Sequence, residues 1–158
     1  MAFNSTITGA NFAFWMSPGD TLTSLDWEVG TLPFGNDVAS GTASGANLTQ
    51  TFMFTNQYGY DINLISISGL NVPVDSGITY WLTLQNATVA SGDPVYWDEN
   101  NGPSEGKQTF EGTIPSESFN LVGNSGSGST PEPGSIVLFS SGVVELGTVL
   151  RRKMRGLN

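Results

Sequence analysis

The chain has 158 residues, of which 38% are apolar and 11% aromatic, and this is enough to build the core of one domain. It contains no cysteine and no histidine, which excludes disulfides, thiolate zinc sites and the usual general base at neutral pH. Residues 1–130 carry twelve acidic side chains against a single base, Lys107, and such a surface repels phosphate backbones. We therefore expect no nucleic-acid partner.

Short apolar or alternating runs follow one another through the first half of the chain, with turn residues between them. The first run, residues 12–16, stops at the turn sequence SPGD. In residues 21–29 apolar and polar side chains alternate, with one shift of the alternation by a single residue. The side chains expected to face inward are Leu22, Leu25, Trp27 and Val29. Residues 33–45 are rich in Gly, Ser, Asn and Asp and are predicted to form a loop.

The same pattern continues up to residue 122. Further strands are predicted at residues 48–56, 62–67, 78–84, 95–97 and 119–122, and residues 78–84 show the best alternation. The run that ends at residue 67 is expected to close at Ser68 and Gly69. No segment before residue 130 has a sustained apolar period of 3.6 residues. Residues 1–122 are therefore predicted to form an all-β module, a single β-sandwich of jelly-roll or immunoglobulin-like topology.

A change of composition separates this module from the C-terminal tail. Residues 123–130, GNSGSGST, are predicted to be a linker. Residues 134–150 contain no base and one acid, Glu145, and as a helix they would be about 25 Å long, slightly less than a hydrocarbon core of about 30 Å. Four of the five basic residues of the chain follow in residues 151–155. The pattern predicts a single transmembrane helix, marginal because of Glu145, with the bases inside and the module outside.

The tail resembles the PEP-CTERM sorting signal of exosortase substrates. Three features carry the resemblance and occur in order: the motif Pro131-Glu132-Pro133, the apolar segment, and the basic cluster Arg151-Arg152-Lys153. The resemblance implies an exported protein of a Gram-negative bacterium. A membrane-embedded exosortase would cut it near the PEP motif, after transient residence in the inner membrane. The product would reach the cell surface or the extracellular matrix, where exopolysaccharide would be a partner.

The module also resembles the β-sandwich domains often found ahead of such tails. The resembling segments are residues 12–27, 80–87, 93–104 and 114–119. The beginning of the chain departs from this picture, because MAFNSTITG has neither the basic nor the apolar region of a secretory signal. We expect that Met1 is not the native start, and that a signal peptide and a first strand precede it.

The densest polar and aromatic cluster of the sequence is DPVYWDENNG, residues 93–102. Two functions suit it: aromatic rings that stack on sugars beside polar groups that bind hydroxyls, or oxygen ligands for Ca²⁺. The candidate ligand contacts are Trp81, Tyr96, Trp97, Asp98 and Asn100. The structural alternative is a long turn with Trp97 packed into the core. No other cofactor or metal is expected.

An enzymatic function is not expected from the sequence. The pattern Ser104-x-x-Lys107 matches that of serine acyl-enzymes, but turn residues flank it here where those enzymes begin a helix. The predicted function is that of an exported structural or binding protein. The alternatives are a secreted carbohydrate- or calcium-binding module with a permanent membrane anchor, and a soluble protein whose tail is an interfacial helix.

Overall fold

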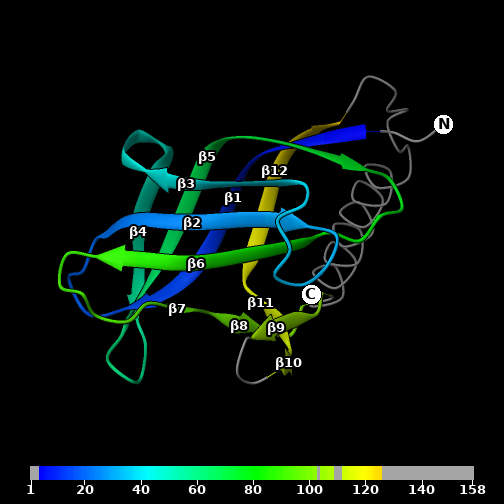
Figure 1. Cartoon of the computed structure of the whole chain (residues 1–158). Helices are drawn as coiled ribbons and strands as arrows, with labels where there is room; N and C mark the ends of the chain where they lie inside the picture. The colour runs from blue at the N-terminus through cyan, green and yellow to red at the C-terminus, as the bar shows by residue number, and fades with distance from the viewer. Residues whose placement is uncertain (1–3, 103, 109–111, 126–158) are drawn as a thin grey trace, which may run out of the picture. The chain divides into compact units, whose positions relative to one another are not determined.

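The computed structural model describes residues 4–102, 104–108 and 112–125, and these residues form an all-β, sandwich-like fold (Figure 1). They belong to one compact unit, residues 1–126. The larger sheet has the strand order β12-β1-β5-β4, and β7 pairs with β1 just beyond the first residue of β12. Its strands are β1 (Asn4–Met16), β4 (Leu48–Thr55), β5 (Asp61–Asp75), β7 (Tyr96–Trp97) and β12 (Phe119–Ser125).

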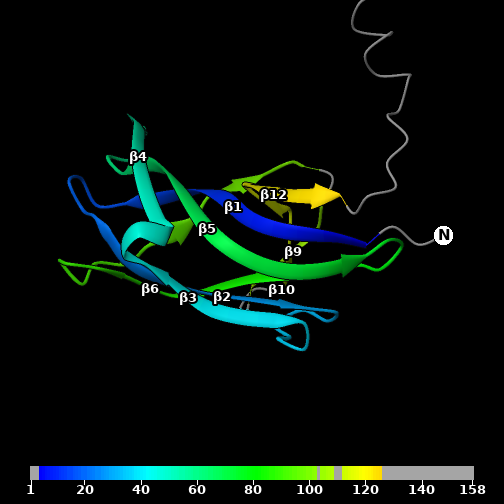
Figure 2. The same ribbon diagram turned by 90° about the horizontal axis from the view of Figure 1, so that it is seen from above.

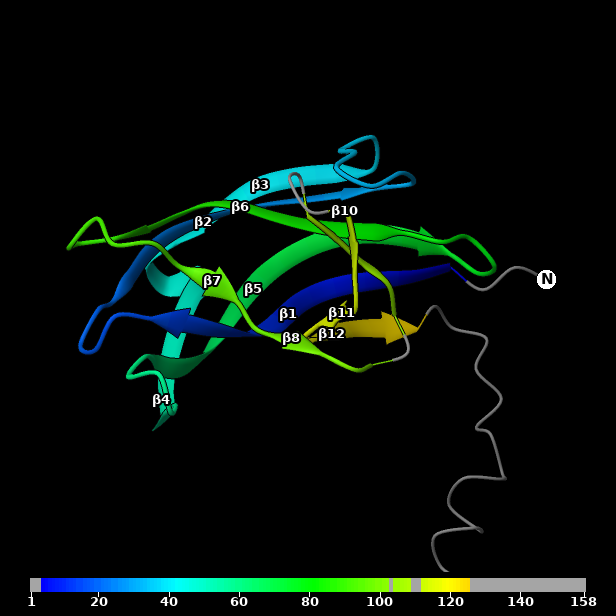
Figure 3. The same cartoon turned by 90° about the horizontal axis from the view of Figure 1, so that it is seen from below.

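A second sheet, of order β3-β2-β6, lies over one face of the first, as Figure 2 shows from the edge. Its strands are β2 (Leu22–Gly30), β3 (Ala39–Ser44) and β6 (Trp81–Val89), and a short 3₁₀ turn, η1 (Gly45–Asn47), joins β3 to β4. Two short ladders pair β8 (Glu99–Asn100) with β11 (Ser116–Glu117) and β9 (Gly106–Gln108) with β10 (Gly112–Ile114). Figure 3 shows these ladders on the side of the sandwich that runs from β6 to β12.

The core fills the space between the two sheets, because successive side chains of a strand point to opposite faces. On β1 the even-numbered residues from Ala10 to Met16 face inward and are almost fully buried. The other buried core residues are Leu22, Leu25, Val29, Ala43, Ile65, Ile67, Leu70, Val72 and Val89. The inward positions predicted for residues 21–29 are thus buried or partly buried. The predicted shift of the alternation corresponds to register shifts of β2 against β6 on both sides of Ser24.

β5 is longer than the sequence pattern indicated. It continues past Gly69 to Asp75, and Gly69 has φ +75°, a conformation that glycine adopts without strain. At this point Ile7 pairs with Val72 while Gly9 pairs with Ser68, so β5 has a bulge against β1. The glycine therefore marks a bulge within the strand and not the end of the strand.

β3 was predicted to be a loop, and this prediction was wrong for residues 39–44. A small residue is needed at position 41 because Trp27 of β2 lies directly across Gly41. A Cβ atom on Gly41 would come within 2.9 Å of Trp27 Cζ2. The glycine at position 41, which suggests a loop, therefore reflects close packing against a tryptophan.

The boundaries of two other strands also differ from the expected ones. β6 begins at Trp81, whereas the alternation started at Ile78, whose side chain is 52% exposed. β12 extends through Gly123, Asn124 and Ser125, which the composition assigned to a linker. A Cβ on Gly123 would lie 2.6 Å from the Thr6 carbonyl oxygen, so the glycine permits close pairing with β1.

The predicted tail lies outside the described residues. This applies to the transmembrane helix at residues 134–150, to the motif Pro131-Glu132-Pro133 and to the basic residues Arg151, Arg152 and Lys153. Within the described ranges, no helix is long and apolar enough to cross a membrane.

Candidate functional site

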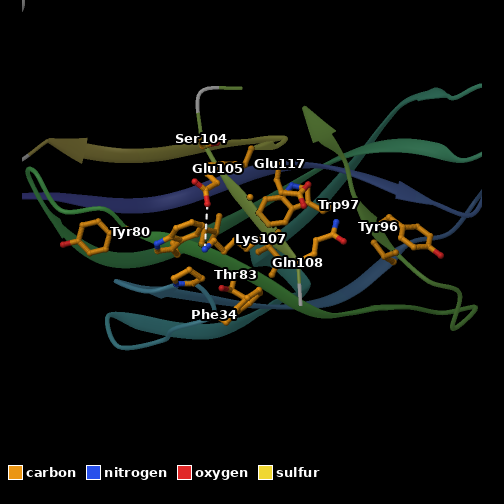
Figure 4. Close-up of a pocket in the computed structure, with 17 residues that line it drawn as sticks. Phe34, Tyr80, Thr83, Tyr96, Trp97, Ser104, Glu105, Lys107, Gln108 and Glu117 are labelled. Atoms are coloured by element: carbon orange, nitrogen blue, oxygen red, sulfur yellow. Dashed lines mark ion pairs between the residues drawn. The ribbon is translucent and has the colours of Figure 1, made fainter. Parts of the chain in front are cut away.

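A pocket of about 390 Å³ lies between β6 and the short strands β9 and β11 (Figure 4). One wall is the start of β6, residues 81–84, and the other comprises residues 104–108 together with Glu117. Phe34, held at φ +60°, also lines it. The pocket therefore brings together segments that are far apart in the sequence.

Lys107 is the only base in residues 1–130, and it lies in this pocket. Its Nζ is 5.5 Å from the centroid of the Trp81 ring and 3.9 Å from Glu105 Oε1, the ion pair marked in Figure 4. A cation over an indole at an exposed site contributes about 0.5–1 kcal/mol. The predicted sugar contact Trp81 thus already has a cationic partner from its own chain. The Ser104 hydroxyl hydrogen-bonds that of Ser116.

Glu117 has the most perturbed carboxyl group of the site. Burial raises its pKa to about 7, and the charge of Glu99, its direct partner in the β8–β11 ladder, acts in the same direction. Asp98 adds a smaller contribution, and Gln108 partly opposes the shift. Within the part of the chain that the structure describes, the Oε2 atom of Glu117 is buried without a hydrogen-bond partner. Below about pH 7 this carboxyl group is therefore mostly protonated and neutral.

Trp97 packs against the hydrophobic core. Its ring meets Phe12 edge-on at 5.6 Å between centroids and Phe119 at 6.2 Å. The indole N–H donates a hydrogen bond to the Ser118 carbonyl at 2.9 Å. Trp97 is thus a partly buried residue that packs β7 against the core, and it also lines the pocket.

The two polar candidates make contacts within the protein. Asp98 Oδ1 accepts a hydrogen bond of 2.5 Å from the indole N–H of Trp15. Asn100 Oδ1 accepts the N–H of Gly102 at 2.8 Å and so stabilises a turn. No group of three or more acidic side chains that could hold a metal ion occurs among the described residues.

Tyr96 belongs to an aromatic cluster that the sequence reasoning missed. The other members are Trp15, Tyr58 and Tyr60. Trp15 sits at an odd position of the apolar run 12–16, and a strict reading of the strand period would have placed it on the face opposite to Phe12 and Phe14. Tyr58 and Tyr60 follow a strand end, where no periodic pattern could connect them with residues 15 or 96.

Comparison of the chain with models of known protein families, with curated proteins and with solved structures found no match. The function must therefore be inferred from the residues and the geometry of this chain.

Proposed function

We propose that the chain is an exported cell-surface or extracellular-matrix protein, associated with exopolysaccharide and cut by an exosortase near its PEP motif. One observation carries this proposal: the motif Pro131-Glu132-Pro133, a segment without bases, and the cluster Arg151-Arg152-Lys153 stand in that order. The charge distribution supports it, because bases directly after an apolar segment hold that end inside while the acidic module stays outside.

The distance between the folded module and the PEP motif also supports processing. The last residue paired in β12 is Ser125, and residues 126–130 separate it from Pro131. Five residues can span at most about 18 Å when fully extended. A protease could therefore reach the motif while β12 remains paired with β1.

For the module we propose an immunoglobulin-like topology in circularly permuted order, in preference to a jelly roll. Immunoglobulin sheets have the orders A-B-E-D and C-F-G. The observed orders β4-β5-β1-β12 and β6-β2-β3 match both when β4, β5, β6, β12, β1, β2 and β3 are taken as strands A to G. The hairpins β2–β3 and β4–β5 then correspond to F–G and A–B.

The second candidate function is a secreted carbohydrate-binding module with a permanent membrane anchor. The aromatic cluster around Trp15 favours it, since the exposed rings of Tyr58 and Tyr96 suit sugar faces. The first candidate function predicts that the tail is cut off near the PEP motif, and the second predicts that the tail is retained.

The test is the intact mass of the protein recovered from the surface and the medium of its native host. A species that ends near residues 131–134 is expected, whereas a species that retains Asn158 would contradict processing and favour a permanent anchor. Replacement of Arg151, Arg152 and Lys153 by Gln should abolish the short species, because the positive flank is lost. Lys107→Gln is the matched control, since it removes the one base outside the tail.

A further inference from the structure

An apolar row crosses the outer face of the larger sheet, on the side away from the second sheet. Residues directly opposite each other on neighbouring strands share a face, and Trp15 pairs with Tyr96 on one side and with Ile62 on the other. Ile62 pairs in turn with Phe54. Tyr96 and Phe54 are 50% and 54% exposed, whereas Ile62 is 4% exposed although it lies outside the main core cluster. Ile62, within the row, is therefore buried, whereas Tyr96 and Phe54 at its two ends are exposed.

A tight turn between β4 and β5 adds two tyrosines to this row. Asn56 Oδ1 accepts the backbone N–H groups of Tyr58 at 2.9 Å and Tyr60 at 3.1 Å. Gly59, at φ +83°, closes the turn. The ring centroids of Tyr58 and Tyr60 lie 5.9 and 6.1 Å from that of Trp15, with interplanar angles of 27° and 34°. The Tyr58 ring thus stacks with Trp15, and the Tyr60 ring is tilted against Trp15 by 34°.

Hydrogen bonds and packing fix these rings before any ligand arrives. The Asp98 carboxylate holds the Trp15 indole, and Asn56 holds the turn that carries both tyrosines. Tyr96 stands nearly perpendicular to Tyr60, at 83° and 6.2 Å, and so forms a wall beside the rings. Fixed side chains lose little conformational entropy on binding. The cluster is therefore preorganised, although 66% of Tyr58 is exposed.

We propose that this aromatic row, made of Trp15, Tyr58, Tyr60 and Tyr96, binds a neutral polysaccharide by stacking against its sugar rings. The inference rests on the binding role proposed above and names its ligand. The C–H face of a pyranose ring is apolar and slightly positive, and it complements the negative face of an aromatic ring. Asp98, beside Trp15, supplies an acceptor for sugar hydroxyls.

Charge decides between neutral and charged polymers. Lys107, the only base in residues 1–130, lies in the pocket beside β6 and contacts Trp81 and Glu105. The aromatic row has Asp98 at Trp15, and Asp61 binds the neighbouring Gly19 N–H and Thr55 hydroxyl. A polyanion would be repelled by these carboxylates, whereas a neutral polymer loses nothing by their presence.

The test is affinity electrophoresis of the full chain, in a mild nonionic detergent, through gels that contain hydroxyethyl cellulose as the neutral polymer or alginate as the anionic one. We expect retardation by the neutral polymer only. Tyr58→Ala and Tyr96→Ala should each weaken the association about fivefold, as expected for the loss of one stacked ring, and the double variant more. Both side chains are half exposed or more, so the variants should fold, and thermal melting checks this.

Phe52→Ala is the matched control, because Phe52 is an exposed aromatic residue that pairs with the buried Asn63 and lies outside the row. Equal binding by all variants, an equal loss in Phe52→Ala, retardation by alginate alone, or no retardation would each overturn the proposal. So would light scattering that shows a dimer which Tyr58→Ala dissociates, since a second copy would then cover the row. Replacement of the tail bases should leave binding intact, so failure of sorting and failure of binding can be told apart.

Discussion

The two faces of the larger sheet use aromatic residues in opposite ways. Phe14 and Trp15 are consecutive in β1, yet Phe14 is buried beneath the second sheet while Trp15 lies on the outer face. Phe12 and Phe14 stack at 6.0 Å within the core, and Trp15 stacks with the exposed Tyr58. The presence of a covering sheet, rather than residue type, decides whether a ring stabilises the fold or remains open to a partner.

The largest expected effect is on the inner face. Phe12 is 1% exposed and contacts Phe14 and Trp97, so Phe12→Ala should lower the free energy of unfolding by about 3–5 kcal/mol. Tyr58→Ala on the outer face should lower it by no more than about 1.5 kcal/mol. Urea denaturation of both variants measures the difference. Similar losses would mean that the outer rings are part of the core.

The inner face also has one polar bridge that a substitution can break. Gln50 accepts the Leu22 N–H at 2.8 Å and donates to the Asp20 carbonyl and to the buried Asn63. Gln50→Ala leaves these groups without partners, and we expect a loss of about 1–3 kcal/mol in unfolding free energy. Thr51→Ala, at the exposed neighbouring position, should change it little. If both variants melt alike, the bridge contributes nothing between the sheets.

The edge of the larger sheet offers a third test. Gly123→Ala should destabilise the fold by about 1 kcal/mol, because the new Cβ would press against the Thr6 carbonyl oxygen. Asn124→Ala is the control, since its side chain is exposed. Thermal melting compares the two. Equal stability of the two variants would indicate that residue 123 belongs to the linker and that β12 ends before it.

The last effect depends on pH and concerns Glu117, at the side of the sandwich. Because its pKa is raised from 4.5 to about 7, the folded state keeps a proton that the unfolded chain has lost, and stability falls as the pH rises through this range. Glu117→Gln should remove that fall: it should be more stable than the parent at pH 8 and about equal to it at pH 5. Asp93→Asn, at an exposed carboxylate, is the control. Urea midpoints at both pH values provide the measurement, and a difference that does not depend on pH would contradict the shift.

Much of the β-structure could be predicted because strand period and turn chemistry are local properties. The turn at residues 17–20 has the expected hydrogen bond from the Asp20 N–H to the Ser17 carbonyl, and Gly19 has a positive φ. The inward positions of β2 followed from alternation alone. The strand ends predicted at Gly69 and before Gly123 were wrong. A bulge and a close contact between strands favour glycine just as a turn does.

The sequence by itself determined the all-β class, the acidic charge of the module and the order of features in the tail, because these are properties of neighbouring residues. Only the tertiary structure decided where each tryptophan packs, although both are partly buried. Trp97 packs against Phe12 and Phe119, whereas Trp15 lies outward beside Tyr58. Both outcomes depend on strand pairings between residues about 80 positions apart, as in Trp15 with Tyr96. Such pairings are selected by the burial of whole faces, which no local pattern contains.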